Sequence, residues 1–246
     1  MQATSELFAP RQTNTGLYAQ LHEAGYSSSA LRDTQRTYRL TCRLFNGKYR
    51  KTERPFVCHA VGAASSVARF DGRLTYLLAA MLHATYDSGQ FPDGRVGGAS
   101  VRHRAWLAKQ VGEAVETIVH RYDRFAFDRG EPERLLRDGF DDADADLVLL
   151  ALAHEVDDLL DFGLSFARKY GAEIESRVAA CAALAERIGK PDLAANLRGR
   201  GALYRDTGWT DDLMSVTLHG YQIVPNVVAY LRLRLEQLRG RFVVRH

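Results

Sequence analysis

Apolar residues recur at steps of three and four along most of the chain, which is the periodicity of an amphipathic helix. Within residues 29–45, for example, Leu31, Tyr38, Cys42 and Phe45 follow this spacing. No run of alternating residues is long enough to predict a sheet, so the pattern predicts an all-α fold. In the first half of the chain the predicted helices cover residues 17–24, 29–45, 55–69, 74–86, 100–110 and 113–123.

The second half of the chain follows the same periodicity. Residues 128–144 are acidic and loosely patterned, which predicts a loop with a short helix. Further helices are expected over residues 144–170, 172–188 and 191–204, and the tail over 210–242 predicts one helix up to Gly220 and another after Pro225. We expect residues 1–170 to form one helical domain and residues 171–246 to form a C-terminal helical extension that packs on it.

Composition and charge narrow the class of protein. The chain has 246 residues, and its net charge of only +3 favours neither nucleic acid nor membrane as a partner. No apolar run approaches the roughly 20 residues of a membrane span, and the N-terminus lacks the pattern of a signal peptide. Three well-separated cysteines are typical of a reduced, cytoplasmic protein. Alternating Arg and Leu after residue 230 favour a helix that docks on a partner subunit, as in a homodimer.

Three of the eight histidines stand out by their surroundings. His59 lies in the first turns of the helix that Pro55 opens, and His83 closes the most apolar helix of the chain. His154 follows the apolar run over residues 147–153. A buried imidazole without a partner costs on the order of 1–3 kcal/mol, so each of the three needs a metal ion or a carboxylate.

Carboxylates occur at suitable spacings near two of these histidines. Asp87 is four residues beyond His83, so the two share a face if the helix continues. His154 and the aspartates at positions 157, 158 and 161 form one polar stripe on an otherwise apolar helix. Histidines and carboxylates from separate helices suit a Mn, Fe or Zn site inside a bundle. The alternative is that the three aspartates form a solvated face that His154 merely borders.

The segment over residues 46–61 resembles the opening of the RelA/SpoT-type (p)ppGpp hydrolase domain, a member of the HD superfamily. It carries a basic pair, Arg50 and Lys51, then a proline and an aromatic residue, and then His59 at the place of a metal-binding histidine. His83 follows at the end of an apolar Leu/Ala helix, as the histidine of the family's His-Asp doublet does. Residues 112–119 are similar to the family's next helix.

Residues 150–154 fall where that family carries its last metal ligand, so the resemblance covers roughly residues 30–165. It implies an HD-domain-like helical bundle that holds one divalent ion through His59, His83 and His154. The chain departs from the family in three places: the doublet reads His83-Ala84, a histidine replaces the last aspartate, and the acidic pair reads Asp87-Ser88. Residues 82–86 are closer to a less characterised HD-related group that also lacks the doublet aspartate.

The activity that the resemblance implies is metal-dependent hydrolysis of a small nucleotide-like or phosphorylated substrate. Asp87 or Asp158 would position or deprotonate water, and Arg50 and Lys51 would contact phosphate, with Tyr86 beside the substrate. Three neutral imidazoles favour Zn or Fe over Mn.

Two other functions remain open on the sequence alone. The missing acidic residues also fit a non-catalytic HD-fold module that binds a nucleotide or a protein. An HD-type iron oxygenase is compatible with extra histidine ligands near Tyr86, although those enzymes normally retain the doublet. Arg50 and Lys51 are equally explained as part of a solvated turn.

Overall fold

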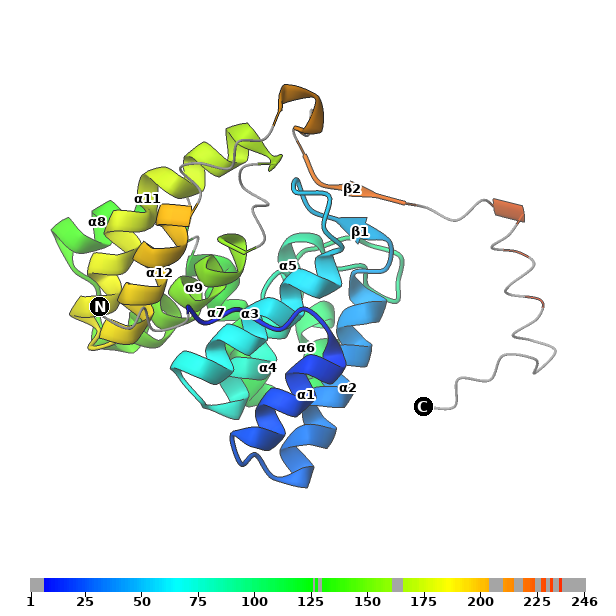
Figure 1. The fold of residues 1–246 in the computed structure, drawn as a ribbon. Helices are drawn as coiled ribbons and strands as arrows, with labels where there is room; N and C mark the ends of the chain where they lie inside the picture. Colours follow the sequence, from blue (N-terminus) through cyan, green and yellow to red (C-terminus); the bar gives the residue numbers. More distant parts are fainter. Residues whose placement is uncertain are drawn as a thin grey trace.

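A computed structural model gives the arrangement of the helices (Figure 1). It describes residues 7–125, 127, 130–160, 166–203, 210–214, 219–223, 227–228, 231 and 235. Within these residues the regular structure is helical apart from one sheet of two short strands, so the predicted all-α fold is confirmed. None of the helices described is both long and apolar enough to span a membrane.

The two N-terminal helices begin at hydroxyl caps. Thr13 accepts a hydrogen bond from the backbone N–H of Gly16 at 3.1 Å, and Ser27 accepts one from Ala30 at 3.2 Å. Such caps satisfy amides that have no partner inside the helix. Both helices therefore start before the first residue that the apolar periodicity predicted, and they span Asn14–Glu23 (α1) and Ser28–Leu44 (α2).

Three apolar helices form the centre of the larger core: α3 (Phe56–Phe70), α4 (Leu74–Leu82) and α9 (Ala145–Asp158). Helix α3 packs against both of the others, because small side chains let the helix axes approach closely. Ala60, Ala63 and Ala64 are all almost completely buried. Side chains from three separate parts of the sequence can therefore converge on one point.

The predicted helix over residues 74–86 is two helices in the structure, α4 and α5 (Thr85–Ser88). The backbone at Ala84, with φ −95° and ψ 15°, leaves the helical conformation. The glycine-rich loop then bonds to this turn, since Gly98 N–H donates to the carbonyl of Tyr86 at 2.6 Å. His83 and Asp87 consequently do not share a helical face, contrary to the prediction.

Helices α6 (Val101–Val111) and α7 (Glu113–Phe125) confirm two predicted helices. Gly112 separates them with a φ of +88°, a conformation that side-chain-bearing residues rarely adopt. The acidic stretch that follows contains one short helix, α8 (Glu131–Asp138), and the 3-10 turn η1 (Asp142–Asp144).

Helix α9 ends at Asp158, so the prediction of a single helix over residues 144–170 is wrong. The chain turns at Leu159 and Leu160, which are 3% and 7% exposed. The apolar pattern continues through this turn because apolar residues indicate which positions are buried, and a buried position need not be helical. Two further helices pack on α8 and α9 around a second core, and they are α11 (Arg168–Arg187) and α12 (Pro191–Leu203).

A short antiparallel pair joins distant parts of the chain, β1 (Lys48–Tyr49) and β2 (Tyr221–Gln222). Figure 1 shows β2 beside β1, and Ile223 N–H donates to the carbonyl of Gly47 at 2.8 Å. Two-residue strands are too short to produce an alternating pattern, so neither of these two strands was predicted. Residues 211–213 form the 3-10 turn η2. Most of the predicted tail helices, including the docking helix, lie outside the described residues.

Candidate metal centre

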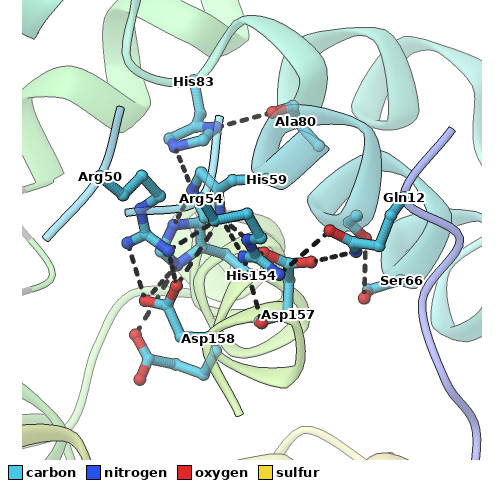
Figure 2. Close-up of polar contacts among 12 residues, drawn as sticks. Gln12, Arg50, Arg54, His59, Ser66, Ala80, His83, His154, Asp157 and Asp158 are labelled. Atoms are coloured by element: carbon cyan, nitrogen blue, oxygen red, sulfur yellow. Dashed lines mark hydrogen bonds and ion pairs between the residues drawn. The ribbon is translucent and has the colours of Figure 1, made fainter. Parts of the chain in front are cut away.

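Three histidines from the core helices meet at one point (Figure 2). His59 lies in α3, His83 directly follows α4, and His154 lies in α9. The Nε2 atom of His59 is 3.3 Å from Nε2 of His83 and 2.9 Å from Nε2 of His154. The structure thus brings together the three residues that the sequence predicts as metal ligands.

These separations match the spacing of ligand atoms around one ion. Zinc–nitrogen bonds of 2.0–2.1 Å place neighbouring nitrogens about 2.9–3.4 Å apart in octahedral or tetrahedral geometry. One nitrogen from each of the three imidazoles lies within 4.8 Å of the others. The set therefore fits a single transition-metal ion.

The other ring nitrogens of two histidines have partners that define their protonation. Nδ1 of His83 lies 2.7 Å from the carbonyl oxygen of Ala80, which can only accept a hydrogen bond. Nδ1 of His59 lies 2.6 Å from a carboxylate oxygen of Asp157. We therefore assign the proton to Nδ1 in both rings. The Nε2 lone pairs then point at the shared centre, as metal ligation requires.

The electrostatics of the cluster keep the imidazoles of His59 and His83 neutral. Burial, reinforced by His154, lowers the pKa of His83 to about 3. Burial together with the Arg50 guanidinium lowers the pKa of His59 well below its ordinary value. Neutral imidazole is the form that binds metal ions.

Two aspartates at the end of α9 complete the cluster. Asp157 and Asp158 are 0% and 3% exposed, so the alternative of a solvated face is wrong for both; Asp161 lies outside the described residues. Burial raises the pKa of Asp158, but Arg50, His154 and Arg54 together lower it by more, so the net shift is downward. His59, His83, His154, Asp157 and Asp158 lie close together and are able to hold a metal ion.

A cavity of about 400 Å³ borders this cluster. Arg50 connects the two, because it lines the cavity and its guanidinium also forms an ion pair with Asp158. Phe56 does the same, since it lines the cavity and its ring centroid is 5.4 Å from that of His59. The remaining lining residues are Lys48, Tyr49, Lys51, Asp87, Ser88, Gly220, Tyr221 and Gln222.

The structure separates the other predicted site residues. Arg50, Lys51 and Asp87 lie around the cavity, whereas Asp158 lies in the histidine cluster. Tyr86 is not among the lining residues described. It is 3% exposed, and its hydroxyl donates to Glu116 at 2.7 Å. The described contacts of Tyr86 therefore place it in the core and not beside the cavity.

Sequence reasoning missed several residues that contact the cluster or the cavity. Lys48 belongs to the same basic turn as Arg50 and Lys51, so the basic composition of that turn could have identified it. Gln12 and Arg54 both donate to Asp157. Gln12 is 145 residues from Asp157 in the sequence, and no spacing rule connects them.

Comparison with protein-family models and with curated proteins found no match to this chain. The resemblance to HD-domain proteins therefore stays a prediction, carried by the residues quoted for it.

Proposed function

We propose that the protein is a metal-dependent phosphohydrolase of the HD type that acts on a small nucleotide-like or phosphorylated substrate. The observation that carries the proposal is the position of Arg50, which lines the cavity and also pairs with Asp158 beside the three histidines. A phosphate held by Arg50 would lie next to the metal centre.

The cavity offers cationic side chains for a phosphorylated ligand. Lys48, Arg50 and Lys51 all line it. Arginine and lysine bind phosphate oxygens through charge-assisted hydrogen bonds. Asp158 and the carbonyl of Ser88 accept hydrogen bonds from Arg50 and Lys48 respectively, which directs both cations along the cavity wall. The aromatic rings of Tyr49 and Tyr221 stack at 5.0 Å and extend the wall with an apolar surface.

In this proposal the histidines hold the metal ion, and the cavity holds the substrate. A divalent ion held by His59, His83 and His154 would polarise a phosphate group and lower the pKa of a bound water. Asp87 is exposed on the cavity wall, and its role in this proposal is to accept a proton from the attacking water. Asp158 is engaged with Arg50, so its role is to hold the guanidinium at the cavity. Three neutral nitrogen ligands favour Zn or Fe over Mn.

The test combines metal content with phosphate release. The wild-type protein and the variants His59→Ala and His154→Ala are analysed for bound Zn, Fe and Mn, and are assayed with nucleotides and sugar phosphates. His22→Ala is the matched control, because His22 lies exposed on α1. We expect one ion per chain in the wild type and the control, loss of that ion in both site variants, and phosphate release only where the ion is present.

Two results would contradict the proposal. The first is a wild-type protein that stays metal-free after soaking with Zn, Fe and Mn. The second is phosphate release that is unchanged in His59→Ala. A protein that holds iron and consumes oxygen without releasing phosphate would favour the oxygenase instead.

A further inference from the structure

Both oxygens of the Asp157 carboxylate accept hydrogen bonds from defined side chains (Figure 2). Oδ2 lies 2.6 Å from Nδ1 of His59 and also accepts from Arg54. Oδ1 accepts from the side-chain amide of Gln12 at 2.7 Å. Arg50 also lies near Nδ1 of His59, at 3.1 Å, but a guanidinium cannot accept a hydrogen bond from Nδ1–H. Asp157 is therefore the partner of the His59 ring.

Gln12 and Arg54 hold the carboxylate in a closed network. The Arg54 guanidinium donates to Oε1 of Gln12 at 3.0 Å, while Nε2 of Gln12 donates to Asp157. These two partners define which end of the Gln12 side-chain amide is the oxygen and which is the nitrogen. Asp157 is fully buried, so no solvent competes for these hydrogen bonds.

The segment that carries Gln12 is anchored at two other points. The backbone N–H of Arg11 donates to Oγ of Ser65 on α3 at 2.9 Å. The carbonyl of Phe8 accepts a hydrogen bond from Nε of Arg200 on α12 at 2.9 Å. The chain before α1 is therefore tied both to α3 and to α12, and this places Gln12 beside the cluster.

Gly62 leaves the room that the carboxylate occupies. It lies inside α3, and a Cβ atom there would be 1.7 Å from Oδ1 of Asp157 and 2.5 Å from Nε2 of Gln12. Alanine is the better helix former at an interior helical position. The glycine is therefore explained by the approach of Asp157 and not by the helix itself.

We infer that Gln12, Arg54 and Gly62 are positioning residues of the metal centre. They hold Asp157 where its carboxylate accepts a hydrogen bond from Nδ1–H of His59, and His59 then directs its Nε2 lone pair at the metal ion. A carboxylate behind a ligating histidine fixes the ring and raises its basicity. This inference rests on the proposed metal centre.

The test measures metal binding in the full-length protein. Gly62→Ala and Gln12→Ala are each titrated with Zn²⁺ against a chelating dye, and the Co²⁺-loaded proteins are compared by visible absorption. Removal of such supporting partners weakens metal binding about 10–100-fold, and we expect that loss together with a changed Co²⁺ spectrum. Ser66→Ala is the matched control, since Ser66 is one turn further along α3 and bonds the carbonyl of Gly62. It should bind Zn²⁺ like the wild type.

The outcomes separate this inference from the proposed function. Wild-type Zn²⁺ affinity and an unchanged Co²⁺ spectrum in Gln12→Ala would overturn the inference, while loss of Zn²⁺ in His59→Ala would leave the metal centre standing. A wild-type protein that binds neither Zn²⁺ nor Co²⁺ would overturn both. Gln12→Ala only shortens a side chain, so it provides the answer even if Gly62→Ala fails to fold.

Discussion

Nε2 of His59 and Nε2 of His154 lie 2.9 Å apart, although 95 residues separate them in the sequence. The packing of α3 on α9 creates this proximity, and His83 joins it from the end of α4. Three nitrogen atoms from three core helices then share one centre. Any ion bound there links the helices of the larger core directly.

Metal binding should therefore stabilise the fold. A ligand that binds only the folded state contributes about 2.7 kcal/mol at a free concentration 100 times its Kd. For a chain of this size that corresponds to a rise in Tm of about 5–10 °C. We expect Zn²⁺ to raise the Tm of the wild type and to leave that of His154→Ala unchanged, as measured by differential scanning calorimetry. An equal rise in both proteins would place the ion elsewhere.

Lys51→Ala should weaken substrate binding without removing the metal ion. Lys51 lines the cavity, and the loss of one charge-assisted contact to phosphate is expected to raise KM about 10-fold, which equals about 1.4 kcal/mol. Steady-state kinetics and elemental analysis check the two halves of this prediction. Lys109→Ala on α6 is the control, because Lys109 is exposed and is not among the residues that line the cavity. A metal-depleted Lys51→Ala protein would contradict the prediction.

Gly97 and Gly94 form a matched pair in the glycine-rich loop. Both have positive φ angles, +66° and +83°, so alanine at either position is strained by about 1–2 kcal/mol. A Cβ at Gly97 would also lie 2.5 Å from the carbonyl oxygen of Asp87, whereas a Cβ at Gly94 meets nothing within 4 Å. We expect Gly97→Ala to lower the free energy of unfolding by about 1–3 kcal/mol more than Gly94→Ala. Urea unfolding measures the difference, and equal losses would refute the argument.

Glu116 should make stability depend on pH in the acid range. Two hydrogen bonds from Arg104, at 2.7 and 2.9 Å, lower the pKa of Glu116, and the Tyr86 hydroxyl adds a third. A carboxyl whose pKa is lowered in the folded state adds stability above its unfolded pKa of about 4.3 and loses it as the pH falls through the folded value.

We therefore expect Glu116→Gln to be less stable than the wild type at pH 7, and the difference to shrink as the pH falls below about 4.3. Urea unfolding between pH 7 and pH 3 measures this difference directly. A difference that stays constant over that range would show that the Glu116 charge is not responsible.

Much of the fold follows from local pattern. The helices that became α2, α3, α6 and α7 were predicted within a few residues, because apolar side chains at steps of three and four report the buried face of a helix. The errors occur where apolar residues are buried without being part of a continuous helix. Leu159 and Leu160 are buried in a turn, and the apolar run over residues 74–86 hides the break at Ala84.

The sequence by itself determined the helical class and the identity of the three histidines, since both depend on residue type and on short-range spacing. Only the tertiary structure decided that Asp157 and Asp158 are buried beside His59, and that Asp87 faces a cavity instead of joining His83. It also decided that Gln12, from the chain before α1, bonds a carboxylate at the end of α9. These relations depend on the packing of segments that are distant in the sequence. Local periodicity does not show which side chain will fill the space beside a glycine such as Gly62.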